Sequence, residues 1–101
     1  MFTPRYQNEQ TDHLIEALLS LKTTEEAYRF LEDVLTIQEM KTITQRLEVA
    51  VMLRNKETYQ EIVRKTGAST TTIGRVNRTL QYGADGYAAV LDRLEETTND
   101  E

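Results

Sequence analysis

Hydroxyl, amide and guanidinium side chains are concentrated in one short segment of this chain, between residues 69 and 78. They are Ser69, Thr70, Thr71, Thr72, Arg75, Asn77 and Arg78. Arginine can donate two hydrogen bonds to guanine, asparagine can pair with adenine, and threonine offers a hydroxyl and a methyl group that suits thymine. The segment therefore predicts contacts with base edges in the major groove of DNA.

A more ordinary interpretation of the same segment stays open. Helices often begin with serine and threonine for capping alone. Small three-helix units with this kind of turn also serve as protein-binding or purely structural modules. The residue types by themselves therefore favour DNA binding without excluding the other two roles.

Two helices joined by a glycine-containing turn would position these side chains. Thr58 can cap the first helix while Glu61 reaches back to it, which is a reciprocal capping box. Gly67 provides the positive φ at which a helix can stop, and Ser69 can cap the second helix. The second helix has an apolar stripe made of Ile73, Val76 and Leu80. This pattern predicts a helix-turn-helix over about residues 58–80, with the recognition helix at 70–80.

Charge is segregated along the sequence. The whole chain has 12 basic and 17 acidic residues and a net charge of −5, which argues against a protein that coats nucleic acid indiscriminately. Between residues 41 and 82, however, eight basic residues stand against three acidic ones. A basic segment on an acidic chain is typical of a face that docks on phosphate.

These observations give a set of predicted DNA-binding residues. We expect Lys56, Arg64 and Lys65 to hold phosphates, and Tyr59 and Gln60 to contact the DNA backbone. The residues expected to contact DNA at the backbone or at base edges are Tyr59, Gln60, Arg64, Lys65, Ser69, Thr70, Thr71, Thr72, Arg75 and Arg78.

Composition argues against several other classes of protein. With 101 residues, 39% of them apolar, the chain has room for one domain, 1–101. There is no cysteine and only His13, so neither a thiolate or histidine metal site nor a nucleophile triad is expected, and we predict no enzyme. No apolar run approaches the roughly 18 to 20 residues that cross a bilayer, and the first residues lack a secretion signal. We expect a cytoplasmic protein without a membrane partner.

Apolar periodicity predicts an all-α chain of six helices. Helices are expected at about 11–21, 23–35, 37–54 and 86–96, besides the two of the helix-turn-helix. Because residues 49–53 are five apolar residues in succession, the end of the third helix should be buried on every side. Stripes this wide cannot all be covered within one chain of this length, so residues 11–54 are predicted to form dimerisation helices. A monomeric bundle that buries the same stripes is the alternative.

Short, ordered matches reveal a family resemblance over about residues 12–94. They are Leu35-Thr36, Glu39 and Arg46 in the third helix, and Glu61, Gly67-Ala68, Thr72-Ile73-Gly74-Arg75, Asn77 and Leu80 further on. The chain thereby resembles the Trp repressor family, in particular the Trp-repressor-related subgroup of the YerC/YecD type. The two blocks are shifted by one residue near 54–57. The resemblance implies a six-helix fold, an intertwined homodimer and a palindromic operator with half-sites about one DNA turn apart.

The resemblance also implies a small-molecule site. In the family the indole of tryptophan lies between two arginines, whose counterparts are Arg46 and Arg75, while Thr36 and Thr79 match polar partners of the amino acid. A salt bridge from Arg46 to Glu39 or Glu48 is the other interpretation. Val76 replaces a family glycine that lies against the indole, so overpacking should exclude tryptophan or weaken its binding. The sequence identifies no other corepressor and no other cofactor.

The sequence thus supports two hypotheses of function. The leading one is a sequence-specific, dimeric DNA-binding transcriptional regulator, a repressor, which reads the major groove of double-stranded DNA with helix 70–80. The alternative is a helical protein–protein interaction module without DNA binding. Because Ser69-Thr70-Thr71 differ from the more apolar residues of the family, no operator sequence can be carried over.

Overall fold

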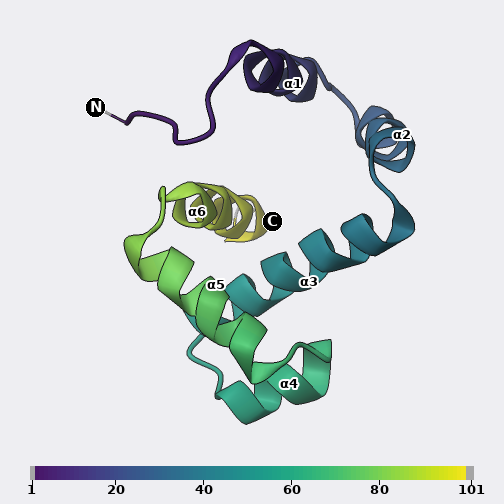
Figure 1. Cartoon of the computed structure of the whole chain (residues 1–101). Coiled ribbons are helices and arrows are strands. Elements are labelled where there is room, and N and C mark those ends of the chain that lie inside the picture. Colours follow the sequence, from purple (N-terminus) through teal and green to yellow (C-terminus); the bar gives the residue numbers. More distant parts are fainter. Residues whose placement is uncertain (1, 100–101) are drawn as a thin grey trace. The chain divides into compact units, whose positions relative to one another are not determined.

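A computed structural model of the chain contains helices and no strand within residues 2–99, the residues that the structure describes. The helices are α1 (Glu9–Leu19), α2 (Thr24–Val34), α3 (Ile37–Arg54), α4 (Tyr59–Thr66), α5 (Thr70–Tyr82) and α6 (Gly86–Asn99), and Figure 1 shows them in chain order. The all-α prediction is confirmed for these residues.

The chain divides into two compact units. Unit 1 comprises Met1–Met40 and unit 2 comprises Lys41–Glu101, so the division falls inside α3. The prediction of a single domain over residues 1–101 is not tested by this division, and Met1 and residues 100–101 lie outside the described part. The two units are described separately.

Local capping explains where the helices of unit 1 begin. Asn8 and Thr11 form a reciprocal capping box at α1, and each of the two bonds is 2.8 Å long. Because of this cap, α1 begins at Glu9, two residues before the start that apolar periodicity predicts. Thr23 caps α2 by accepting from the Glu26 N–H at 3.0 Å. The Glu26 carboxylate accepts from the Lys22 N–H instead of that of Thr23, so only half of a reciprocal capping box forms here.

The start of α3 shows a complete reciprocal capping box. The Thr36 N–H donates to Glu39 Oε1 at 2.8 Å, and the Glu39 N–H donates to Thr36 Oγ1 at 3.0 Å. Hydrogen bonding of the Glu39 carboxylate by the Thr36 backbone N–H, and secondarily by the Thr36 side chain, holds the pKa of Glu39 below its ordinary value. Two N–H groups that a helix start leaves unpaired are thereby satisfied.

The core of unit 2 is small and draws on every helix of that unit. Its buried side chains are Val49, Ala50, Met52, Ile62, Ala68, Ile73, Val76 and Leu91. Val51 and Leu53 are only half-buried in the single chain, so the prediction that residues 49–53 are buried on every side was wrong. The periodicity of a helix shows how wide its apolar surface is, but not how many neighbouring helices cover it.

A turn without glycine connects α3 to α4. Lys56 has a φ of 63°, in the left-handed region. The Lys56 N–H donates to the Leu53 carbonyl and the Glu57 N–H to the Met52 carbonyl, each at 3.0 Å. This pair of bonds is the Schellman arrangement, in which the left-handed position is usually occupied by glycine. No sequence signal marked this helix end.

Removal of a core side chain should weaken unit 2 strongly. Ile73 is fully buried, so Ile73→Ala should lower the free energy of unfolding by about 2–5 kcal/mol through lost burial and the cavity left behind. Denaturant titration followed by circular dichroism would measure it. Val63→Ala, at a residue of α4 that is 37% exposed, is the control and should cost less than about 1 kcal/mol. Equal losses in the two variants would contradict this description of the core.

Candidate nucleic-acid interface

The two N-caps and the glycine stop predicted for α4 and α5 are present in the structure. Thr58 Oγ1 accepts from the Glu61 N–H at 3.2 Å, and Ser69 Oγ accepts from the Thr72 N–H at 3.1 Å. Gly67 has a φ of 74°, and its N–H donates to the Val63 carbonyl at 2.9 Å. Figure 1 shows the two helices joined by the short turn, which we call the α4–α5 pair. The Glu61 carboxylate pairs with Arg64, so it does not complete the predicted capping box.

Polar contacts that the sequence analysis missed fix the turn between the two helices. Thr66 Oγ1 donates to the Ile62 carbonyl at 2.7 Å and accepts from the Ala68 N–H at 3.1 Å. Gln45, on α3, donates from Nε2 to the Thr66 carbonyl at 3.2 Å. The end of α4 is therefore tied to α3 by a side chain that lies 21 residues earlier in the chain.

The first turn of α5 presents hydroxyl groups to solvent. Ser69, Thr70 and Thr71 are exposed, whereas Thr72 is half-buried. The Ser69 hydroxyl lies 3.2 Å from the Thr72 hydroxyl and donates to it. Of the predicted base-contacting hydroxyls, those of Thr70 and Thr71 are therefore the more accessible to a ligand.

Two arginines on the outer side of α5 are exposed. Within residues 2–99 the side chains of Arg75 and Arg78 have no ion-pair partner. Asn77, in contrast, is half-buried and donates from Nδ2 to Tyr59 Oη at 3.4 Å. Asn77 and Tyr59 therefore link the two helices, although sequence reasoning had placed Asn77 on the outer surface of the recognition helix.

The two basic residues of α4 form ion pairs. Arg64 Nη2 lies 2.6 Å from Glu61 Oε2, and Lys65 Nζ lies 2.7 Å from Glu57 Oε1. The hydrogen bond from Arg64 holds the pKa of Glu61 below its ordinary value and raises the pKa of Arg64. Gln60 and Lys56 are exposed. The predicted phosphate-binding residues thus include two that already have a carboxylate partner.

A third basic residue of unit 2 is bound to α6. Arg54 pairs with Asp92 and, through Nε at 3.2 Å, with Glu95, and its Nη1 donates to the Ala88 carbonyl at 3.4 Å. The hydrogen bond to Asp92 raises the pKa of Arg54. No local sequence signal indicates this contact, which joins the end of α3 to α6. Arg54 contributes to the basic segment of the sequence, but its charge is compensated.

The four predicted ligand-binding residues fall in both units. Thr36 lies in unit 1, where its hydroxyl caps α3. Arg46, Arg75 and Thr79 lie in unit 2, and the Thr79 hydroxyl donates to the Arg75 carbonyl at 3.0 Å. Among residues 2–99 Arg46 has no ion pair, so the salt bridge considered as its alternative role is not formed.

Val76, expected to disfavour tryptophan, is 4% exposed and belongs to the core of unit 2. Its side chain therefore packs with the chain's own apolar residues. The effect of this valine on a small molecule stays a prediction.

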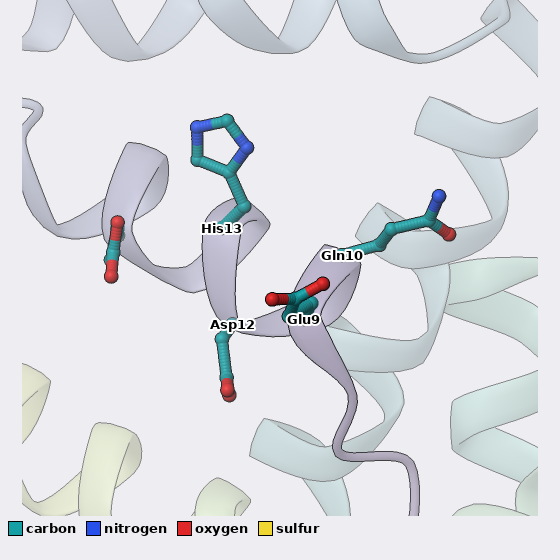
Figure 2. Close-up of a pocket in the computed structure, with 5 residues that line it drawn as sticks. Glu9, Gln10, Asp12 and His13 are labelled. Atoms are coloured by element: carbon teal, nitrogen blue, oxygen red, sulfur yellow. The ribbon is translucent and has the colours of Figure 1, made fainter.

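A shallow depression on α1 is unrelated to the basic residues. It is lined by Glu9, Gln10, Asp12, His13 and Glu16, and Figure 2 shows the labelled side chains pointing in different directions from one helix. Among residues 2–99 no group of three histidine, cysteine or acidic side chains could hold a metal ion. None of the helices in that range is long and apolar enough to span a membrane.

Comparison with known proteins gives consistent matches along most of the chain. Residues 9–95 match the family model described as Trp repressor protein. The chain is 50% identical over 93 residues to the uncharacterized protein YerC of Bacillus subtilis (strain 168), with 92% of this chain and 89% of that protein covered.

Two crystal structures are similar to the chain as well. One is a TrpR-like protein from Eubacterium eligens ATCC 27750, with a TM-score of 0.85 at 54% identity over 88% of this chain and 92% of that one. The other, a provisional Trp repressor from Staphylococcus aureus, has a TM-score of 0.85 at 43% identity over 88% and 89% of the two chains. The predicted Trp-repressor-like fold is confirmed.

The ion pair on α4 can be tested by titration. Arg64→Met removes the hydrogen bond that lowers the pKa of Glu61, so this pKa should rise toward the ordinary value of 4.5. Because the folded pKa lies below that of the unfolded chain, the pair stabilises the fold at neutral pH, and this contribution is lost as the pH falls through the folded pKa. Carboxyl ¹³C shifts measure the pKa directly. Arg29→Met, which removes the partner of Glu25, is the control, and an unchanged Glu61 midpoint in Arg64→Met would contradict the assignment.

Proposed function

Because this chain belongs to the Trp repressor family, a family of DNA-binding regulators, we propose that it is a dimeric, sequence-specific transcriptional repressor of the cytoplasm. Its α5 enters the major groove of double-stranded DNA, and α4 lies across the phosphate backbone. Occupancy of the operator blocks the polymerase. The residues that contact DNA are those predicted from the sequence.

The observation that carries this proposal is the division of α5 into two faces. Ile73 and Val76 are buried in the core of unit 2, whereas Arg75 and Arg78 are exposed and have no ion pair among the described residues. A helix held by one side and presenting unpaired guanidinium groups on the other suits the edges of guanine, to which arginine donates two bonds. Thr70 and Thr71, exposed at the start of the same helix, add hydroxyl groups.

Exposed apolar surface on the first helices supports the dimer. Neither α1 nor α2 has a buried residue in the single chain. The large apolar side chains exposed on α1 are Leu14, Ile15, Leu18 and Leu19. A second copy that covers them would make a two-fold dimer with two α5 helices about one DNA turn apart, so the operator is a palindrome.

Tryptophan is disfavoured as a corepressor. The hydroxyls of Thr36 and Thr79 already make hydrogen bonds within the chain. Val76, at the position of the family glycine, has a buried side chain. Arg46 and Arg75 stay the residues that would flank a small molecule. DNA binding in the absence of any added amino acid is the behaviour that these contacts favour.

A protein-interaction module is the second candidate function. The same exposed apolar side chains of α1 favour it, because such patches also mark surfaces for other proteins. Salt distinguishes the two candidates. Phosphate binding weakens steeply between about 50 and 200 mM salt, whereas apolar helix packing does not.

Selection of bound sequences from a random DNA pool tests the proposed function. At roughly physiological salt and without an added ligand, the purified protein should enrich a palindrome with half-sites about one turn apart. Arg75→Ala should lose this enrichment or relax it at one base pair of each half-site, at a cost of about 1–3 kcal/mol. Arg29→Ala, which removes the same charge from α2, is the control. Enrichment of the same palindrome by Arg75→Ala would contradict base contact by Arg75.

Sedimentation tests the dimer independently of DNA. The protein should sediment at twice the 11.7 kDa of one chain. Ile15→Glu places a charge on the exposed apolar side of α1 and should shift the protein to the monomer, because a buried unpaired charge is costly. His13→Glu is the matched control at an exposed residue of the same helix. A wild-type protein that sediments as a monomer at all concentrations would refute the dimer.

A further inference from the structure

The cations of α4 differ from those of α5 in one respect. Arg64 and Lys65 each have a carboxylate within 2.7 Å, supplied by Glu61 and Glu57. Arg75 and Arg78 have no such partner in the part of the chain that the structure describes. On α4, the two cations expected to hold phosphate are therefore already paired, whereas the two arginines of α5 have no ion-pair partner among residues 2–99.

The two carboxylates are held close to their partners by the backbone. The Glu57 N–H is bonded to the Met52 carbonyl in the turn after α3, and the Glu57 side chain is 26% exposed. The Glu61 N–H is bonded to the Thr58 hydroxyl in the first turn of α4. The backbone of both glutamates is already held by these hydrogen bonds, so each ion pair forms with little further loss of backbone conformational entropy.

A phosphate must compete with these carboxylates. Carboxylate and phosphate oxygens take the same charge-assisted bonds from guanidinium and ammonium groups. Exposed ion pairs contribute little to stability, so a phosphate can displace the carboxylate. The displaced acid is then left beside the DNA backbone, where like charges repel each other whatever the base sequence.

We propose that Glu57 and Glu61 attenuate the sequence-independent part of DNA binding by competing with phosphate for Lys65 and Arg64. This inference rests on the proposed function. The strength with which the protein binds any DNA is then set in part by its own acids. The protein binds a DNA site stably only where the free energy of the base contacts of α5 compensates for the weakened phosphate contacts.

Fluorescence anisotropy with a labelled 30-base-pair duplex of random sequence tests the inference. Glu57→Gln and Glu61→Gln keep the side-chain shape and remove the charge, and each should tighten binding by about 3- to 10-fold at about 100 mM salt. The slope of log Kd against log salt should steepen by up to about one per carboxylate, because no freed acid remains beside the DNA. The same gain is expected on the duplex recovered by selection.

Two controls separate competition from a change in net charge or in folding. Glu25→Gln removes a carboxylate that also pairs with an arginine one turn away, at 3.2 Å, but on α2. It should leave the affinity nearly unchanged. The gain from Glu61→Gln should be smaller when Arg64 is alanine, because only the repulsion between Glu61 and the DNA backbone is then relieved; a general effect of charge or stability would give the same gain in both backgrounds.

The outcomes distinguish this inference from the proposed function. Wild-type protein that binds duplex DNA, with glutamine variants that bind no more tightly than Glu25→Gln, would overturn the inference alone. A gain from Glu61→Gln that is equally large in the Arg64→Ala background would overturn it as well. Failure of all variants to bind DNA at low salt would overturn the proposed function and this inference together.

Discussion

The burial of Ile73 and Val76 of α5 against α3 and α4 is the constraint on which the rest of unit 2 depends. Val49 and Ala50 of α3 belong to the same core, as does Ile62 of α4. Because one face of α5 is fixed in this way, the opposite face must point to solvent. Arg75 and Arg78 are therefore exposed as a result of the packing of Ile73 and Val76. The orientation of the polar face thus follows from apolar packing.

Polar contacts add precision to that apolar framework. Gln45 holds the carbonyl at the end of α4, Asn77 holds the hydroxyl of Tyr59, and Arg54 holds two carboxylates of α6. Each contact is partly exposed and so contributes modestly to stability. Together they join α3 to α4, α4 to α5 and α3 to α6, so these three helix pairs are held by directional bonds as well as by shape.

Much of the fold could be predicted because its signals are local. The caps at Thr58 and Ser69 and the stop at Gly67 are read from residues one turn apart, and the structure contains all three. Contacts between distant residues gave no such signal: Gln45 and Thr66 are 21 residues apart, and Arg54 and Asp92 are 38. Composition likewise counted every cation as available, although the geometry compensates Arg54, Arg64 and Lys65 with nearby acids.

The junctions at the two ends of the α4–α5 pair share an unusual backbone. Lys56, before α4, has a φ of 63°, and Asp85, after α5, has a φ of 64°. A residue with a side chain adopts this left-handed conformation at a cost of about 1 kcal/mol, somewhat less for aspartate. The surroundings therefore hold both junctions above their preferred backbone energy. At Lys56 the two hydrogen bonds of the Schellman arrangement offset this cost, so the chain can turn between α3 and α4 without a glycine.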